Sequence, residues 1–453
     1  MSLLTLIVHL NLICIIVNNG GGMNSTRYLL VLDYLPARIG EIANIRDYIR
    51  HNYSLELVII SDMLSGEEKD ITPFVYHIPV RTENYVDSVM AVIAELKMTC
   101  AGILPFMDAV SGYAAVIAKK LNVYGDDPEL SFAGIEKYQF RQQETQILPL
   151  LMAQRIKTPR YTFINDIKEL EEFYDSVPYG VIIKPNCGRA NLGVVAVKDR
   201  SKISAAFAQS VAQSGGNQIL AEELITFDTE YSYDGIGCMA FLTQKVSQKG
   251  EFPVEIGQIV PAQCDGRNVI ALHKAGQAMN LISGQILGAF HNEIKQDSET
   301  GETFLVETNR RPAGMRIWDM ANRVYGISLQ EIWVDHLVKG FSDQMVLPKA
   351  KGRAFLINLL ARKSGKINDN FDKTEVSDIL LASVNNILNK LDYEIIAVKI
   401  NLDKHSYVYE TPKSNNDFCG YVCVHINDEH IECESLMNEI NDDWQGILAN
   451  YIS

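Results

Sequence analysis

The sequence of 453 residues has fewer basic than acidic side chains, 41 lysines and arginines against 56 aspartates and glutamates, and a formal charge of −15. Nucleic-acid binding depends on cationic side chains that neutralise phosphates, so no nucleic-acid partner is expected. The eight cysteines are scattered, which suits reduced thiols and a cytoplasmic location better than a disulfide framework. With 47% hydrophobic residues, the chain is not disordered, and its length predicts two or three domains.

A hydrophobic run at the amino terminus is too short and too interrupted to be a good membrane span. Residues 2–17 are broken by His9 and Asn11 and fall short of the roughly 20 residues that cross a bilayer. The run also lacks the basic flank and the cleavage site of a signal peptide. We expect residues 1–22 to be a doubtful extension upstream of a true start at Met23, and no membrane partner. The alternative is a membrane anchor, which amino-terminal sequencing of natively expressed protein would reveal.

Two common nucleotide-binding motifs are absent. Residues 27–129 alternate strand-like runs with helix-period segments, which predicts a small α/β domain with a parallel sheet. Its first strand is followed by Asp33-Tyr34-Leu35-Pro36 rather than by G-x-G-x-x-G, and the chain has no Walker A motif. The expected strands are residues 28–32, 55–60 and 101–105, and the expected helices are residues 40–51, 84–96 and 110–121.

The remainder of the chain is predicted to be mixed. A helix pattern at residues 135–154 ends before Thr158-Pro159-Arg160, and β-rich sequence continues to about residue 340. The tail from residue 346 alternates strands with helices and predicts a smaller α+β unit. Further strands are expected at residues 181–184, 194–197, 219–222, 231–236, 304–307, 354–360, 393–400 and 420–425.

A first candidate site follows the strand at residues 181–184. This strand ends in Lys184-Pro185, and a loop of small residues that includes Gly188 leads to the returning strand. One ammonium group and several backbone N–H groups would then lie beside one cavity, an arrangement that can bind a polyphosphate. The alternative is a surface β-hairpin with an exposed lysine.

A second candidate site is acidic. The apolar strand at residues 219–222 continues into Glu223 and Leu224, and Glu230 follows. Backbone groups at such a strand end can pair with an adenine ring, and a later carboxylate can accept hydrogen bonds from ribose hydroxyls. The alternative is a set of charges on a solvated strand end.

The third candidate site spans two strands. Alternation places Glu307, Asn309 and Arg311 on one face of the second strand, and Glu293 on the first strand can face them. Two carboxylates and an amide oxygen suit Mg²⁺, and phosphates would complete its coordination. Arg311 would then lie where negative charge develops. A salt-bridged sheet face does not require the asparagine, so a metal site is favoured. His291 is expected either to support a metal ligand without binding the metal or to pack nearby, and to have no catalytic role.

In their order and spacing, these segments resemble the ATP-grasp superfamily. The resemblance covers the chain after Met23 and includes Lys137 and Arg141, which precede the three candidate sites. Within the superfamily, the chain is most similar to carboxylate–amine ligases typified by bacterial L-amino acid (dipeptide) ligases of the bacilysin-synthetase type. Residues 288–293 and 420–423 fit that branch.

The resemblance implies a fold that combines α/β and α+β parts. An N-terminal Rossmann-like (pre-ATP-grasp) domain would occupy residues 23–130, and an ATP-grasp domain residues 131–345, with a lid at about 160–225. A C-terminal α+β domain would occupy residues 346–453.

The resemblance also implies roles for the candidate residues. The ATP phosphates would be bound by Lys137 and Lys184, under the loop that contains Gly188. Adenine would be bound by Glu222, Glu223 and Leu224, and the ribose by Glu230. Two Mg²⁺ ions, or Mn²⁺ in their place, would be held by Glu293, Glu307 and Asn309, and the catalytic residues would be Lys184 and Arg311.

The substrate pocket departs from the family pattern. Glu255 and Gln258 stand where dipeptide ligases carry a Glu-x-x-His segment, and the glutamine leaves the acid substrate open. Arg311, Gly314 and Met315 would complete the pocket, and Met315 leaves more room than the bulky Trp of the bacilysin type. The segment before the ribose-binding glutamate is one residue longer than in many relatives, so the adenine-binding segment could shift by one.

The implied activity is ATP-dependent joining of a carboxylate, with an L-amino acid as one substrate, to an amine. The carboxylate would first form an acyl phosphate, and ADP and phosphate would be released. The partners would be these small molecules, and a homodimer is compatible with the resemblance. Two alternatives remain, a ligase or carboxylase acting on a non-amino-acid metabolite and a nucleotide-binding regulatory module without turnover. The intact third candidate site argues against the regulatory module.

Overall fold

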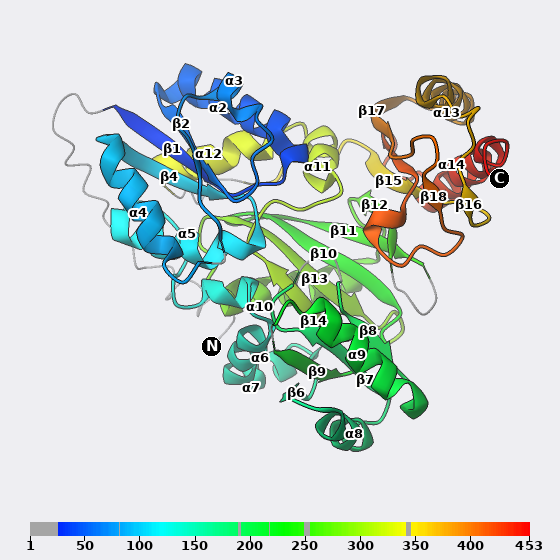
Figure 1. The fold of residues 1–453 in the computed structure, drawn as a ribbon, viewed down its shortest axis with the longest axis horizontal. Coiled ribbons are helices and arrows are strands. Elements are labelled where there is room, and N and C mark those ends of the chain that lie inside the picture. The colour runs from blue at the N-terminus through cyan, green and yellow to red at the C-terminus, as the bar shows by residue number, and fades with distance from the viewer. Residues whose placement is uncertain (1–25, 81, 189–191, 217, 249–253, 341–345) are drawn as a thin grey trace.

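The computed structural model describes residues 26–80, 82–188, 192–216, 218–248, 254–340 and 346–453. The expected extension at residues 1–22, the expected start at Met23 and residues 189–191 of the expected lid lie outside this range. Among the described helices, none has both the length and the apolar character needed to cross a membrane. Figure 1 shows three lobes arranged around a long central sheet.

The first lobe is a four-stranded parallel sheet with the order β3-β2-β1-β4. Alternate residues of β1 pack into two different cores, Leu29 and Val31 on one face and Leu30 and Leu32 on the other, because helices cover both faces. The strands are β1 (Arg27–Leu32), β2 (Glu56–Ser61), β3 (Val75–His77) and β4 (Thr99–Pro105), and the main helices are α2 (Ile39–Tyr53), α4 (Tyr85–Leu96) and α5 (Asp108–Leu121). The predicted parallel α/β lobe is confirmed.

The single helix expected at residues 135–154 is wrong. The chain forms two helices, α6 (Lys137–Gln146) and α7 (Leu148–Ala153), which meet at Ile147. Pro149 explains the break, because it has no N–H to continue the hydrogen-bond ladder and is tolerated only in the first turn of a helix, where it lies in α7.

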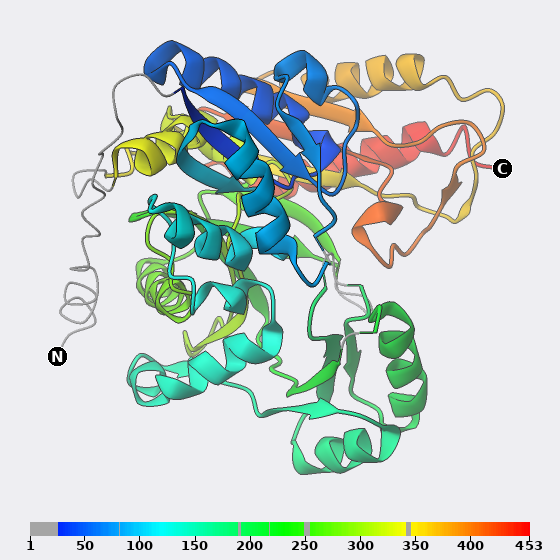
Figure 2. The same ribbon diagram turned by 60° about the vertical axis from the view of Figure 1, so that its left-hand side comes forward.

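The second lobe is a four-stranded sheet with the order β6-β9-β7-β8. Figure 2 shows it projecting from the rest of the molecule with two helices beside it. Its elements are β6 (Tyr161–Ile164), α8 (Ile167–Ser176), β7 (Val181–Pro185), β8 (Val195–Val197), α9 (Ile203–Gln213) and β9 (Ile219–Glu223). The predicted hairpin is confirmed, since β7 pairs with β8 in antiparallel fashion, and β9 pairs with the other edge of β7.

The central sheet has nine strands in the order β17-β19-β15-β12-β11-β10-β13-β14-β5. The C-terminal strands therefore extend the same sheet, through antiparallel pairing of β15 with β12. The strands are β5 (Ile156–Lys157), β10 (Thr229–Ile236), β11 (Met239–Ser247), β12 (Glu255–Val260), β13 (Ala289–Gln296), β14 (Thr303–Asn309), β15 (Arg353–Leu359), β17 (Tyr393–Ile400) and β19 (Gly420–Ile426). The division at residue 346 stays a prediction.

Among the helices that pack on the central sheet, α11 (Ile317–Tyr325) and α12 (Leu329–Lys339) connect it to the first lobe. Trp318 of α11 and Trp333 of α12 are buried in one core that also contains residues of β1, β12 and β15. This core fixes the loop between β14 and α11, which contains Arg311. The other helices on this sheet, α10 (Gly266–Ile282), α13 (Lys373–Leu388) and α14 (Cys433–Leu448), belong to other cores.

Candidate active site

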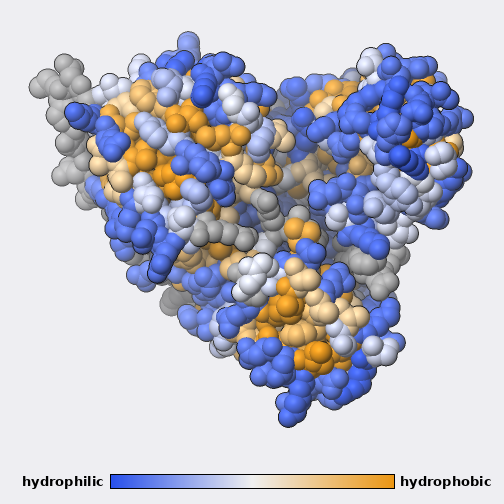
Figure 3. Space-filling model, viewed as in Figure 1, coloured by the Kyte–Doolittle hydropathy of each residue, from blue (hydrophilic) through white to orange (hydrophobic). Residues whose placement is uncertain are grey.

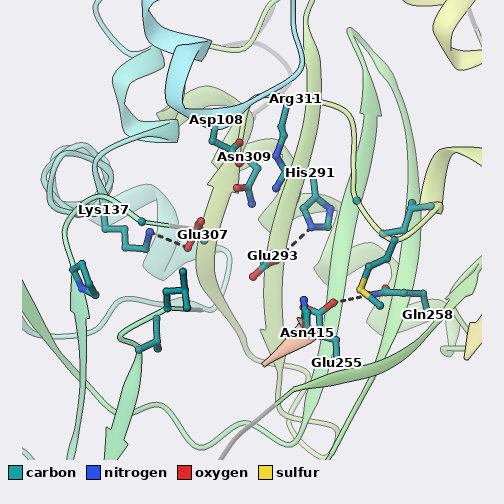
Figure 4. A pocket seen from close by; sticks show the side chains of 17 residues that line it. Asp108, Lys137, Glu255, Gln258, His291, Glu293, Glu307, Asn309, Arg311 and Asn415 are labelled. Carbon is teal, nitrogen blue, oxygen red and sulfur yellow. Dashed lines mark hydrogen bonds and ion pairs between the residues drawn. The ribbon is translucent and has the colours of Figure 1, made fainter. Parts of the chain in front are cut away.

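A cavity of about 150 Å³ lies between the first lobe, the second lobe, the central sheet and the C-terminal part of the chain, each of which contributes to its lining. Figure 3 shows the surface hollowed in this region, and Figure 4 shows the side chains that line the cavity. Ten of the residues predicted from the sequence line it: Lys137, Gly188, Glu255, Gln258, Glu293, Glu307, Asn309, Arg311, Gly314 and Met315. The other predicted residues, Lys184, Glu222, Glu223, Leu224 and Glu230, lie outside the lining.

The strand pair β13–β14 forms the wall with the predicted metal ligands. Glu293 lies directly opposite Glu307, and His291 lies opposite Asn309. Residues opposite each other in an antiparallel pair point to the same face, so both carboxylates and the amide project into the cavity. The predicted juxtaposition of these three side chains is therefore present. Their oxygen atoms fit a hard divalent cation such as Mg²⁺.

Lys137, the first residue of α6, pairs with one of these carboxylates. Its Nζ lies 3.3 Å from Oε2 of Glu307. Burial disfavours the ammonium, but the Glu307 carboxylate outweighs this effect and raises the pKa of Lys137. The start of α6 is tied to the segment after β7, because the backbone N–H groups of Lys137 and Tyr138 both donate to Asn186.

Asp108, the first residue of α5, was missed by sequence reasoning. Its Oδ2 accepts a hydrogen bond of 2.6 Å from Nε of Arg311, although 203 positions separate the two residues. Burial disfavours the guanidinium charge, but Asp108 outweighs this effect and raises the pKa of Arg311. The first lobe therefore orients the arginine that lies beyond the end of β14.

Lys184 lies outside the cavity lining, in a buried ion-pair network. Its Nζ lies 2.8 Å from Oε2 of Glu222, whose carboxylate also accepts hydrogen bonds from Nε and Nη2 of Arg141. Although burial disfavours the carboxylate, Arg141 and Lys184 lower the pKa of Glu222 to about 2. Lys184 is only 5% exposed, so the alternative of a surface hairpin with an exposed lysine is wrong.

The segment proposed to bind adenine already uses its backbone donors within the protein. The N–H of Glu223 donates to the carbonyl of Arg160, and the N–H of Leu224 donates to the carbonyl of Gly180. The Glu223 side chain pairs with the exposed Arg160 side chain at 3.2 Å. The assignment of adenine binding to this segment stays a prediction.

Lys245 of β11 is the second residue that sequence reasoning missed. Its side chain is fully buried, and its Nζ lies 2.6 Å from Glu255, 2.7 Å from Glu293 and 3.5 Å from Glu230. Glu230, predicted to bind the ribose, lies directly opposite Lys245 on the neighbouring strand β10. One ammonium group therefore links a predicted metal ligand to a predicted substrate residue.

His291 lies on the cavity wall and contacts the same predicted metal ligand, Glu293. Its Nε2 lies 3.3 Å from Oε1 of Glu293, and its Nδ1 lies 2.6 Å from Oδ1 of Asp234. The Asp234 carboxylate also accepts hydrogen bonds from the hydroxyls of Ser232 and Thr243. Burial disfavours the imidazolium, but Asp234 outweighs this effect and raises the pKa of His291 to about 9. Of the two roles expected for His291, the contact with Glu293 favours support of a predicted metal ligand over packing alone.

The predicted substrate pocket lies at the opposite end of the cavity from Lys137. Nε2 of Gln258 donates to Oε2 of Glu255 at 2.6 Å and lies 3.7 Å from the sulfur of Met315. Within the part of the chain that the structure describes, Oε1 of Gln258 has no hydrogen-bond partner. Asn415, from the C-terminal part of the chain, also lines the cavity and had no signal in the sequence.

Glu144 provides a test of the buried network by pH. Its carboxylate shares Arg141 with Glu222, and burial raises its pKa from 4.5 to about 7. A carboxyl with a raised folded-state pKa favours folding below pH 4.5, and this contribution is lost as the pH rises to about 7. We expect the unfolding free energy of wild type to fall, relative to Glu144→Gln, by up to about 3 kcal/mol across this window. Urea denaturation of both proteins at pH 5 and pH 8 measures the difference, and an unchanged difference would contradict the expectation.

Several solved structures are similar in fold to nearly the whole chain. An L-amino acid ligase from Bacillus licheniformis superposes with a TM-score of 0.68 at 17% identity, over 92% of this chain and 98% of the other. A carboxyaminoimidazole ribonucleotide synthase from Aspergillus clavatus, solved with ATP, superposes with a TM-score of 0.63 at 14% identity, over 93% and 99%. A phosphoribosylglycinamide synthetase from Anaerococcus prevotii gives a TM-score of 0.60 at 13% identity, over 92% and 98%.

Sequence comparisons match shorter segments, and no protein-family model matches the chain. The arginine-specific large chain of carbamoyl phosphate synthase from Eremothecium gossypii is 23% identical over 249 residues, 53% of this chain and 21% of that protein. A formate-dependent phosphoribosylglycinamide formyltransferase from Sodalis glossinidius is 34% identical over 77 residues, 17% of this chain and 20% of that protein. The matched segments thus span about a fifth of each curated relative, and it is the fold that the likenesses establish.

Proposed function

Because the chain has the ATP-grasp fold, we propose that it is an ATP-dependent carboxylate–amine ligase with an L-amino acid as one substrate. The observation that carries the proposal is the meeting of Lys137, Glu293, Glu307, Asn309 and Arg311 in one cavity. Cations that can bind phosphates and oxygen atoms that can bind Mg²⁺ lie within the same space, as phosphoryl transfer requires.

The proposed reaction overcomes the low reactivity of a carboxylate toward an amine. The carboxylate attacks the γ-phosphate of ATP to form an acyl phosphate, and ADP leaves. The amine then attacks the acyl carbon, and phosphate leaves and takes up the proton that the amine loses. When held by Glu293, Glu307 and Asn309, Mg²⁺ would supply positive charge against the phosphates. Lys137 would exchange Glu307 for a phosphate, and Arg311, oriented by Asp108, would stabilise negative charge that develops on the reacting groups.

Other wall residues would protect and orient the reactants. Pro185, Gly188 and Leu192 line the cavity on the side of the second lobe, where they would limit the access of water to the acyl phosphate. At the other end, the Glu255 carboxylate and the Oε1 atom of Gln258 are hydrogen-bond acceptors. These acceptors suit the ammonium group of an α-amino acid, which supports an amino acid as the acid substrate.

Phosphate release tests the proposal directly. Purified protein is incubated with ATP and Mg²⁺ and with each of the common amino acids, singly and in pairs. Phosphate release that requires particular pairs, together with a product of the corresponding dipeptide mass, is the expected result. ATP binding without release for any pair would instead favour a non-amino-acid substrate or a regulatory module.

Lys184→Ala tests the proposed ATP site separately. In the proposed complex Lys184, now paired with Glu222, would donate to an ATP phosphate. Its loss is therefore expected to weaken ATP binding about 10- to 100-fold while changing the KM of the acid little. Lys168→Ala is the matched control, because Lys168 is an exposed lysine of the same lobe. Calorimetric titration with ATP measures the effect, and unchanged affinity in Lys184→Ala would mean that the lysine is only structural.

A further inference from the structure

Three carboxylates meet around one lysine at the centre of the site. Oxygen atoms of Glu230, Glu255 and Glu293 lie within 4.8 Å of one another, close enough to hold a metal ion. The Nζ of Lys245 already lies within 3.5 Å or less of all three carboxylates. The space between these carboxylates is thus occupied by a cation that belongs to the protein.

The chemistry of the lysine matches this position. An ammonium group has three N–H donors and no acceptor, so it can donate one hydrogen bond to each carboxylate. Without it, three negative charges would lie close together in a buried place, at a high electrostatic cost. The lysine is held in the middle of the sheet, since β11 pairs with β10 on one side and with β12 on the other.

Two of the three carboxylates belong to different halves of the site. Glu293 faces Glu307 on the wall of the predicted metal ligands, whereas Glu255 accepts a hydrogen bond from Gln258 in the predicted substrate pocket. Lys245 is therefore a direct connection between the two halves, with distances of 2.7 Å and 2.6 Å.

We infer that Lys245 is a positioning residue that sets Glu293 and Glu255 relative to each other and keeps divalent cations out of the space between them. This inference deepens the proposed function, on which it rests, by coupling metal placement to placement of the acid substrate. Lys245 itself does not line the cavity, and it acts through Glu293 and Glu255, which do.

Mn²⁺ binding, measured by electron paramagnetic resonance on nucleotide-free protein, tests whether the Lys245 ammonium keeps divalent cations out of the space between the three carboxylates. Lys245→Met removes the charge at similar length and is expected to bind one more Mn²⁺ ion than wild type. Lys245→Arg keeps a cation there and is expected to bind no extra ion. Lys295→Met is the matched control, because Lys295 lies opposite Glu230 on β13 and is expected to leave Mn²⁺ binding unchanged. Equal Mn²⁺ stoichiometry in Lys245→Met and wild type would overturn the inference.

Steady-state kinetics test the coupling. Lys245→Met is expected to lower kcat/KM for the acid about 10- to 100-fold, as for residues that orient metal ligands, and to raise the KM of the acid while the affinity for ATP stays nearly constant. Unchanged kcat/KM for the acid would overturn the coupling. If Lys245→Met folds poorly, Lys245→Gln, which removes the same charge but keeps N–H donors, replaces it and carries the same predictions. The Mn²⁺ measurement needs no turnover, so it gives a result even if the ligase activity is not found.

Discussion

Replacing Glu307 with glutamine is expected to lower turnover about 10³-fold or more without disturbing the fold. The substitution keeps the volume of the side chain but removes the charge that would hold the divalent cation, and metal ions contribute several kcal/mol to such reactions. Glu307 is partly exposed on the cavity wall, and its ion pair with Lys137 spans 3.3 Å, so the fold does not depend on it. Rates of phosphate release at saturating ATP and Mg²⁺ measure the effect.

A nearby glutamate supplies the control for this variant. Glu302 lies just before β14, outside the cavity lining, and pairs with the half-exposed Lys157 at 3.0 Å. Glu302→Gln is therefore expected to retain the wild-type rate. If Glu307→Gln turns over as fast as Glu302→Gln, Glu307 is not a metal ligand.

The largest loss of stability is expected from Arg141→Met. The buried guanidinium donates to Glu222 through Nε and Nη2, to Glu144, and to the carbonyl oxygens of Leu305 and Val306 at 2.9 and 3.2 Å. It thereby connects α6, the second lobe and β14. Its removal leaves two buried carboxyl groups without this partner, and breaking a buried pair in this way costs about 3–5 kcal/mol.

Denaturant unfolding followed by circular dichroism measures this loss, with Arg160→Met as the control. Arg160 pairs with Glu223 at 3.2 Å but is exposed, so its removal is expected to cost less than about 1 kcal/mol. Similar unfolding midpoints for Arg141→Met and Arg160→Met would mean that the buried network does not hold the lobes together.

The geometry of the predicted metal ligands could be deduced from the sequence because strand periodicity is local. Alternation along one strand places Glu307 and Asn309 on one face, and the adjacent position of Glu293 requires only that consecutive strands pair. The structure has this register, with Glu293 directly opposite Glu307. Three strands and the three main helices of the first lobe were predictable for the same reason, since their apolar periodicity is regular, whereas the short strand β3 was not predicted.

Residues that act across long sequence separations could not be found in this way. Asp108 contacts Arg311 only because the first lobe packs on the loop after β14, and no local pattern encodes that packing. Lys245 did leave a weak signal. It follows Phe241 and Thr243 on the same face of a strand with a buried interior, where an unpaired lysine would be unstable.

The break between α6 and α7 shows how a local rule can be outweighed by an apolar pattern. The helical periodicity of residues 135–154 continues through Pro149, but the missing N–H of proline acts on the backbone and is independent of that periodicity. Pro149 was therefore the signal in the sequence that a new helix, α7, begins at Leu148.

Transfer of ¹⁸O tests the central claim, formation of an acyl phosphate, most directly. The protein is incubated with ATP, Mg²⁺, the amine and an amino acid whose carboxylate oxygens carry ¹⁸O, and the released phosphate is analysed by mass spectrometry. In the proposed reaction one carboxylate oxygen leaves with the phosphate, so each turnover is predicted to give phosphate with one ¹⁸O atom. If unlabelled phosphate is released as fast as ADP forms, the protein simply hydrolyses ATP, and the proposed function is contradicted.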